Sequence, residues 1–177
     1  MTVVNPVPLE KAAREARDTY EAIRKRLGKV ANFYAMMGHR PNVLKNFVAL
    51  YGSVMNEGTV EARYKELAYL KTSAINGCEY CSRAHMANAK QIGITDEQIK
   101  ALQFYERSPL FNDKEKATIL YAERVTRGAA GIRTDTLEEL RKHYDEAQIV
   151  ELTLVICTAN FTNRFNDALK NIPDLGV

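Results

Sequence analysis

Hydrophobic residues recur along most of the chain at the spacing of three and four that places them on one face of an α-helix. No stretch of useful length shows the alternation of apolar and polar residues that is typical of a half-buried strand. The pattern therefore predicts an all-α fold of about eight helical segments joined by short turns. The eight expected helices are 8–27, Pro41 to Gly58, 59–76, 78–92, 95–105, 112–128, 136–144 and 145–171, with a further short apolar piece at 30–37.

Several helix starts are marked by polar residues whose side chains accept hydrogen bonds from the free amides of the first turn. Thr59 is expected to be such an N-cap for the helix that follows Gly58. Three pairs have the spacing of a capping box, in which two side chains three residues apart bond each other's amides. These pairs are Thr95 with Gln98, Asn112 with Glu115, and Asp145 with Gln148. The last pair opens a long apolar helix through Asn171, which Pro173 stops.

A faint internal repeat links the middle of the chain to its end. Glu66-Leu67 and Glu151-Leu152 lie 85 residues apart, and at the same offset Cys78 corresponds to Asn163. Because Glu, Leu and Ala are common in helices, the identities alone prove little. They favour a domain of two related helical halves, of which only one carries thiols.

The composition is that of one globular domain spanning residues 1–177. Of these residues 46% are hydrophobic and 27% charged, and the net charge is +3 with no basic block. These values exclude wholesale disorder and predict no nucleic-acid or membrane partner. The start shows no signal peptide, and the longest uncharged stretch, 152–163, is too short to span a bilayer. We therefore expect a cytoplasmic protein.

The chemistry-bearing segment runs from Asn76 to His85 and contains two of the three cysteines. An odd count argues against a disulfide-stapled secreted scaffold. On a helix, Cys78, Cys81 and His85 share a face within roughly 60°. Cys78 is expected in the first turn, where the helix dipole lowers a thiol pKa. Two thiols with a nearby base are the parts of a thiol–disulfide or peroxide-reducing centre.

Glu66 joins this group if the chain folds back at Asn76-Gly77. Residues at similar distances on either side of the turn then meet, which brings Glu66 to His85. A carboxylate beside an imidazole orients the ring and raises its basicity. The sequence thus predicts a Glu–His pair next to the two thiols.

Other interpretations of these residues are weaker. A zinc site needs four ligands, and no second Cys-x-x-Cys or His pair lies near the first, so no metal is expected. Cys157 sits in an apolar run and is expected to be a core residue. His39 is expected at the surface or as a cap. The segment 33–37 is expected in the core or in a subunit interface rather than in a substrate pocket, and Asn163 and Arg164 in solvated, capping or subunit contacts.

These residues resemble the AhpD-like alkylhydroperoxidases of the carboxymuconolactone decarboxylase superfamily. The motif of that family is a glutamate, eleven intervening residues and Cys-x-x-Cys-x-x-x-His, which Glu66, Cys78, Cys81 and His85 match at every spacing. The similar core spans about 47–102, and the segment ending at 160–165 resembles the C-terminal half of peroxidase-related members. The prototype enzymes have a second histidine between the cysteines, where this chain has Tyr80.

The resemblance implies an all-α fold that assembles as trimers or hexamers and a peroxidase that reduces alkyl hydroperoxides. It implies that Cys81 attacks the peroxide and that Cys78 resolves the product and faces the reductant. Glu66 and His85 relay the proton. The dipole argument favours Cys78 as the more acidic thiol, whereas the resemblance favours Cys81, and we follow the resemblance because His85 is one turn from Cys81. No bound cofactor is expected, and the reductant is an external dithiol of lipoamide or thioredoxin type.

Two alternatives remain open. The same scaffold could isomerise or decarboxylate a small organic acid with Glu66 and His85 as an acid–base pair and idle thiols. It could also be a redox-sensing module in which oxidation of Cys78 and Cys81 switches an oligomer interface.

Overall fold

The computed structural model describes residues 2–175, and within this range the chain forms helices and no strands. The predicted all-α class is confirmed. The α-helices are α1 (Arg14–Leu27), α2 (Asn32–Met37), α3 (Pro41–Asn56), α4 (Ala62–Asn76), α5 (Glu79–Gln91), α6 (Asp96–Ala101), α7 (Asp113–Gly128), α8 (Thr134–Arg141) and α9 (Glu146–Ala168). Short 3-10 turns lie at Leu9–Lys11, Leu102–Arg107 and Ala129–Gly131.

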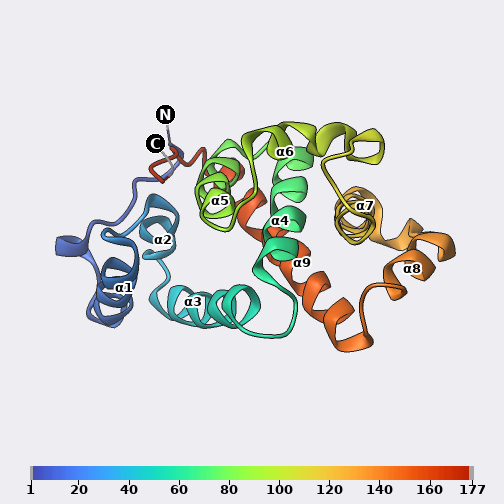
Figure 1. Cartoon of the computed structure of the whole chain (residues 1–177). Coiled ribbons are helices and arrows are strands. Elements are labelled where there is room, and N and C mark those ends of the chain that lie inside the picture. Colours follow the sequence, from blue (N-terminus) through green and yellow to red (C-terminus); the bar gives the residue numbers. More distant parts are fainter. Residues whose placement is uncertain (1, 176–177) are drawn as a thin grey trace.

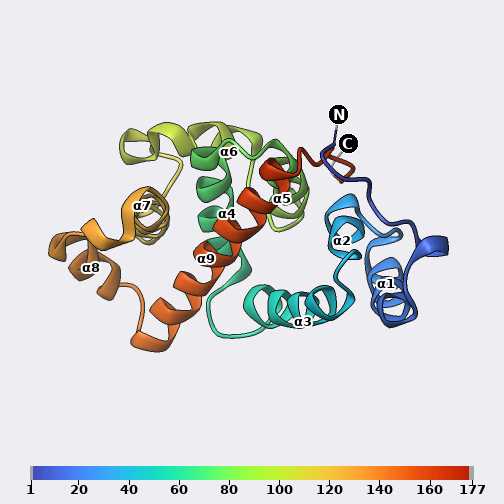
Figure 2. The ribbon, with the colours of Figure 1, turned by 180° about the vertical axis from the view of Figure 1, so that it is seen from behind.

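Helix α4 is the centre of the molecule. All its residues from 65 to 73 are buried, because α5, α7 and α9 pack around it. Figures 1 and 2 show α4 and α9 crossing in the middle, with α1–α3 on one side and α7 and α8 on the other. The N-terminal segment lies beside the end of α9, where the amide of Val3 donates to the carbonyl of Leu169 at 3.0 Å. A helix buried on every side can present polar groups to an internal site, and α4 carries Glu66 there.

Two hydrophobic clusters hold this arrangement. The larger joins α1–α3 to α4, α5 and α9 and includes both Cys78 and Cys81. The smaller lies between α4, α5, α6 and α7, around Leu67, Leu70 and Ile119. The thiols therefore sit inside the larger core and not on its edge.

The three predicted capping boxes are confirmed at α6, α7 and α9. Other boundaries differ. The first α-helix begins at Arg14, because Ala12 and Ala13 are extended and separate it from the turn at Leu9–Lys11. Helix α8 begins two residues earlier than predicted, at Thr134.

Thr59 is not an N-cap, contrary to the prediction. Helix α4 begins at Ala62 after Glu61, and the Thr59 side chain caps nothing there. The amides of Thr59 and Val60 instead donate to the Glu151 carboxylate at 2.9 and 3.2 Å. Glu151 also pairs with the buried Lys65 at 2.6 Å, so the loop before α4 is fastened to α9.

Helix α9 ends at Ala168, earlier than the predicted Asn171. Lys170 has φ 54°, the left-handed conformation that stops a helix. The amide of Asn171 then donates to the carbonyl of Asn166 at 2.9 Å, and that of Lys170 to Asp167 at 3.2 Å. This pair of bonds is a Schellman motif, here without the usual glycine.

None of the helices in the described range combines the length with the apolar composition that crossing a bilayer requires.

Candidate active site

The turn between α4 and α5 places the two cysteines. Gly77 has φ 71°, which glycine adopts at little cost, and the amide of Cys78 donates back to the carbonyl of Ser73 at 3.0 Å. This Schellman turn reverses the chain, and α5 then runs back along α4. The predicted fold-back at Asn76-Gly77 is therefore present.

Cys78 is the N-cap of α5 and does not lie in its first turn as predicted. Its Sγ accepts from the amide of Cys81 at 3.4 Å and lies 3.0 Å from Cys81 Sγ. Cys78 is 0% exposed and Cys81 3% exposed. The expectation that Cys78 faces the reductant is wrong for this conformation, because the hydrophobic core encloses its thiol.

Cys81 is the more acidic thiol. The Cys78 thiol donates a hydrogen bond to Cys81 Sγ, and this bond is the main reason why the pKa of Cys81 is lowered to about 6. The amide of Asn166 lowers this pKa as well, whereas burial raises it. Asn166 Nδ2 lies 3.2 Å from Cys81 Sγ. The same hydrogen bond, together with burial, raises the pKa of Cys78. The dipole argument for Cys78, which we set aside in favour of Cys81, does not hold in this structure, because a hydrogen bond inside the pair outweighs the dipole at Cys78.

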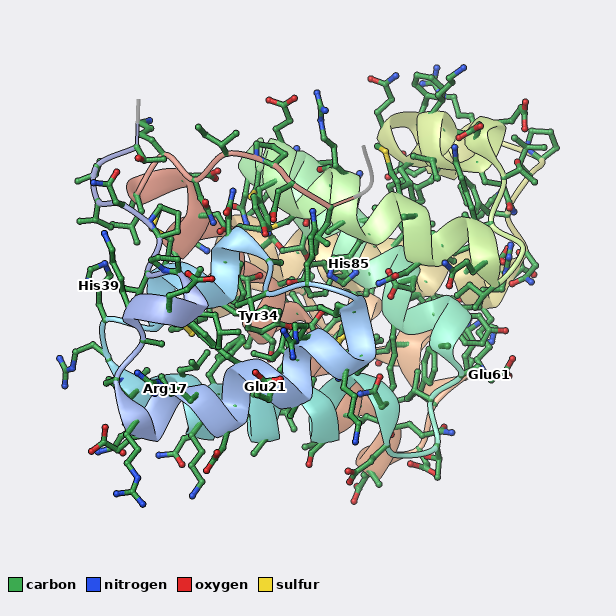
Figure 3. The ribbon with its side chains drawn as sticks, turned by 90° about the vertical axis from the view of Figure 1, so that its left-hand side faces the viewer. Arg17, Glu21, Tyr34, His39, Glu61 and His85 are labelled. Carbon is green, nitrogen blue, oxygen red and sulfur yellow. The ribbon has the colours of Figure 1, made fainter. Side chains whose placement is uncertain are left out.

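Glu66 meets His85 as the turn geometry predicts. His85 Nδ1 lies 2.7 Å from Glu66 Oε2, and both side chains are buried. The imidazole stacks on the ring of Tyr69 with centroids 3.4 Å apart, which fixes its plane. Its other nitrogen, Nε2, lies 3.2 Å from the hydroxyl of Tyr51. Figure 3 shows His85 near Tyr34 in the interior, whereas His39 and Glu61 lie toward opposite edges.

His85 makes no hydrogen bond to Cys81 among those within the described residues. Its two nitrogens are taken by Glu66 and Tyr51. The charge of a protonated His85 still contributes to the lowered pKa of Cys81. The imidazole therefore acts on the thiol electrostatically, and it lines the same pocket as Cys81 and Tyr51. Sequence reasoning missed Tyr51, since nothing in its spacing ties it to the motif.

Tyr80, which replaces the second histidine of the prototypes, has a structural partner. Its hydroxyl donates to Asp174 Oδ1 at 2.8 Å and accepts from the amide of Phe33 at 3.1 Å. Asp174 also accepts from the amide of Asn32. Tyr80 therefore joins α5 to α2 and to the segment that follows α9.

Two adjoining cavities open on the site. A pocket of about 370 Å³, part of it open to solvent, reaches Cys81 between aromatic rings. A larger groove of about 1200 Å³ reaches Glu66 and His85 but not the thiols. Tyr34, Tyr51, Ala84, His85 and Leu175 line both. A substrate in the groove could thus extend past His85 toward the sulfur.

Several other residues lie elsewhere than predicted. Cys157 is exposed on α9 and is not a core residue. His39 is at the surface, as expected, with Nε2 2.9 Å from the carbonyl of Asn5. Phe33 and Tyr34 are buried as predicted, but they also line the pocket. Asn163 is fully buried and donates to Ser73 Oγ at 3.1 Å, so it contacts the protein's own core.

Within residues 2–175, no three His, Cys, Asp or Glu side chains gather in the way that a metal site requires. The groups that the site brings together are two thiols, an imidazole–carboxylate pair and several phenols.

Residues 41–124 match the sequence profile of the carboxymuconolactone decarboxylase family, a range that holds Glu66, both cysteines of the pair and His85. The uncharacterized protein YdfG of Bacillus subtilis is 30% identical over 116 residues, which cover 65% of this chain and 79% of YdfG. This chain belongs to the carboxymuconolactone decarboxylase family. Its AhpD-like branch is shown by the similar solved structures.

Among these structures is a protein of unknown function from Agrobacterium tumefaciens, described as a candidate AhpD antioxidant defence protein. It is 28% identical with a TM-score of 0.74, and the match covers 79% of this chain and 96% of that one. An uncharacterized peroxidase-related protein from a Silicibacter species is 25% identical with a TM-score of 0.85, over 98% and 92%. The debrominase Bmp8, 20% identical with a TM-score of 0.84 over 99% and 94%, shares the fold alone.

Proposed function

We propose that this member of the family is a thiol-dependent peroxidase that reduces organic hydroperoxides with Cys81 as the nucleophile. The observation that carries the proposal is the surroundings of Cys81: a thiol donor at 3.0 Å and an amide donor at 3.2 Å, with its pKa lowered to about 6. A thiolate is the nucleophilic form of cysteine, so this sulfur is ready to react near neutral pH.

In the first step the Cys81 thiolate attacks an oxygen of the hydroperoxide. A sulfur–oxygen bond forms, the O–O bond breaks, and an alkoxide leaves with the electron pair and takes up a proton. The products are an alcohol and the sulfenic acid of Cys81. Glu66 holds His85, and His85 and Tyr51 are hydrogen-bonded to each other and both line the pocket, so these three residues supply the proton.

In the second step the Cys78 sulfur attacks the sulfenic acid. The thiol proton and the hydroxyl leave as water, and a Cys78–Cys81 disulfide forms. The 3.0 Å separation of the sulfurs means that little movement is needed. An external dithiol of lipoamide or thioredoxin type then reduces the disulfide by exchange. Because both sulfurs are buried, this exchange requires the site to open or the reductant to enter the pocket.

The test is consumption of an organic hydroperoxide in the presence of a small dithiol, followed by mass-spectrometric mapping of the cysteines. We expect turnover in the wild type and in Cys157→Ser, the matched control with an exposed thiol, and none in Cys81→Ser. One equivalent of peroxide should yield a Cys78–Cys81 disulfide. Unmodified thiols and no turnover would refute the proposal, whereas a disulfide without turnover would indicate a redox sensor.

A second function is favoured by the larger groove. It reaches Glu66 and His85 but neither thiol, and Arg26 on its wall could hold a carboxylate. This arrangement suits an acid–base enzyme that isomerises or decarboxylates a small organic acid. Such an activity would survive complete alkylation of the thiols, whereas peroxidase activity would be lost.

The homo-oligomer is part of the proposal. Helix α9 exposes an apolar stripe formed by Val150, Leu154, Cys157 and Phe161, which recur at helical spacing. A second copy of the chain is the partner that the resemblance implies. Sedimentation of the wild type against Leu154→Glu tests this, and a wild type that is monomeric at micromolar concentration would contradict it.

A further inference from the structure

The side-chain amide of Asn166 is aimed at the reactive sulfur. Its Nδ2 lies 3.2 Å from Cys81 Sγ, and the two residues are 2% and 3% exposed. A neutral thiol accepts hydrogen bonds weakly, whereas a thiolate accepts them strongly. A buried N–H pointing at sulfur therefore favours the charged form.

Asn171 is the partner of the other end of that amide. Its Nδ2 donates to Asn166 Oδ1 at 2.9 Å. Since the oxygen of Asn166 is occupied by this donor, the NH2 group is the end left to face Cys81. The two asparagines thus form a chain of donors that ends at the thiol.

The turn at the end of α9 holds Asn171 in this position. Lys170 adopts φ 54°, a conformation that costs a non-glycine residue energy, and the amide of Asn171 bonds back to the carbonyl of Asn166 at 2.9 Å. The backbone bond and the side-chain bond join the same two residues. The strained turn therefore sets the side chain of Asn171 directly over that of Asn166.

We propose that Asn166 is a catalytic residue, the donor that stabilises the Cys81 thiolate, and that Asn171 is the residue that positions it. The inference rests on the proposed peroxidase function for its role in turnover. When the sulfur–oxygen bond forms, the charge passes from sulfur to the leaving alkoxide. Asn166 therefore adds to the amount of thiolate present, beside the Cys78 thiol and Asn163, while the proton for the alkoxide comes from elsewhere.

Other groups also act on this sulfur and must be kept constant in the test. The titratable groups around Cys81 are Cys78 and His85 on the α5 side, Tyr51 on α3 and Tyr69 on α4, with Asp167 of α9 near Cys78. Substituting Asn166 by an apolar residue of similar size changes none of them.

The experiment measures the pKa of Cys81 directly, by the ultraviolet absorbance of its thiolate against pH and by the rate of iodoacetamide alkylation. A Cys157→Ser background removes the exposed thiol. We expect Asn166→Leu to raise the Cys81 pKa by about one unit or more, since a hydrogen bond to a charged group contributes about 1.5–3 kcal/mol. At pH 6, close to the Cys81 pKa of about 6, a rise of one unit should slow alkylation about fivefold, and a larger rise should slow it more.

Asn166→Asp should raise the pKa further, because a carboxylate donates nothing and adds a like charge. Asn171→Ala should raise it less, since Asn166 remains but is no longer held. Asn112→Ala is the matched control: it removes the cap of α7, costs about 1 kcal/mol and leaves the thiols untouched.

An unchanged pKa in Asn166→Leu and Asn166→Asp would overturn the proposal. A lowered pKa in Asn166→Leu would overturn it too, because it would mean that the amide oxygen accepts from the Cys81 thiol. If circular dichroism shows that the Asn166 variants fail to fold, the Cys81 pKa of Asn171→Ala becomes the test, and an unchanged pKa in that variant would overturn the proposal. None of these measurements uses peroxide, so failure of the peroxidase proposal would be seen separately, as absent turnover with the pKa shift intact.

Discussion

Two helix ends meet at Cys81, and both are built in the same way. Helix α4 ends at Asn76 and α9 at Ala168, and each is followed by a residue in the left-handed conformation, Gly77 and Lys170. In each, the next residue bonds back to the last turn, Cys78 to Ser73 at 3.0 Å and Asn171 to Asn166 at 2.9 Å. Both turns thus direct a hydrogen-bond donor toward the reactive sulfur.

The difference lies in what each end delivers. The α4 end presents the Cys78 thiol, which in the proposed reaction becomes bonded to Cys81. The α9 end presents the Asn166 amide, which stays unchanged in that proposed reaction. In the proposed reaction, Cys78 at the α4 end therefore reacts with Cys81, whereas Asn166 at the α9 end only has to remain in place. Substitutions at the two ends should have different effects for this reason.

The largest effect is expected on the reactive side. Cys81→Ser should lower peroxidase turnover by at least about a thousandfold, because no thiolate remains. Cys78→Ser should keep a single burst of peroxide consumption and lose steady-state turnover, since the sulfenic acid forms but is not resolved. Stopped-flow consumption of peroxide measures both. A Cys78→Ser variant that turns over at the wild-type rate would remove Cys78 from the mechanism.

The glutamates of the two central helices allow a similar comparison, between a residue expected to act in the reaction and a residue expected to stabilise the fold. Glu66 on α4 bonds His85 at 2.7 Å, whereas Glu151 on α9 bonds Lys65 at 2.6 Å and closes the loop before α4. Glu66→Gln should lower turnover by about a hundredfold with little loss of stability. Glu151→Gln should leave the site chemistry intact and cost about 3 kcal/mol of unfolding free energy, because Lys65 is left buried without its charge partner. Urea unfolding beside the peroxide assay measures the pair.

The contribution of Glu151 to the free energy of unfolding should depend on pH in a definite direction. Burial alone would raise the pKa of Glu151, but Lys65 and the amides of Thr59 and Val60 lower it overall. Because the pKa of Glu151 is lower in the folded state, its carboxylate stabilises the fold at pH values above its ordinary pKa of 4.5. This stabilisation is lost as the pH falls below 4.5 and through the lowered pKa of the folded state. The stability gap between wild type and Glu151→Gln should therefore narrow in acid. A gap that widens there would contradict the assignment.

These pairs also show what sequence could and could not predict. The contact of Glu66 with His85 follows from a local rule, the reversal at Gly77, and local rules can be read from sequence. The roles of Asn166 and Tyr51 depend on how α9 and α3 pack against α5, which no spacing in the motif encodes. The weak repeat at 85 residues does relate Cys81 to Asn166, but it gives no reason to expect that they touch.

The errors have a common physical origin. The dipole argument placed the lower pKa on Cys78 because it considered one helix end in isolation. In the folded protein the Cys78 thiol donates to Cys81, and a hydrogen bond between buried groups outweighs the end of a helix. Cys157 lies in an apolar run, yet it faces outward because α9 presents an apolar stripe on its exposed side as well.

A smaller effect is expected where the segment after α9 is held to α5. Tyr80 donates to Asp174 at 2.8 Å, and Leu175 beside it lines the pocket that reaches Cys81. Tyr80→Phe removes the hydrogen bond to the Asp174 carboxylate, which is worth about 1.5 kcal/mol, and also the acceptor of the Phe33 amide. Alkylation of Cys81 by a bulky maleimide should therefore accelerate, by roughly tenfold. The rate with small iodoacetamide should change less. Equal acceleration with both reagents would indicate an altered thiol and not easier access.

The smallest effect concerns the two left-handed residues themselves. Gly77 has open space where a Cβ would stand, so Gly77→Ala meets no clash and should cost only the strain of its φ of 71°, about 1 kcal/mol. Lys170→Gly relieves similar strain at φ 54°, but it makes the unfolded chain more flexible. The two terms oppose each other and should leave a stabilisation of about 0.5 kcal/mol. Urea unfolding measures both variants. If Lys170→Gly were clearly destabilising, the lysine side chain would have to stabilise the turn. The strain of the left-handed conformation would then not explain the difference in stability between the Gly77 and Lys170 variants.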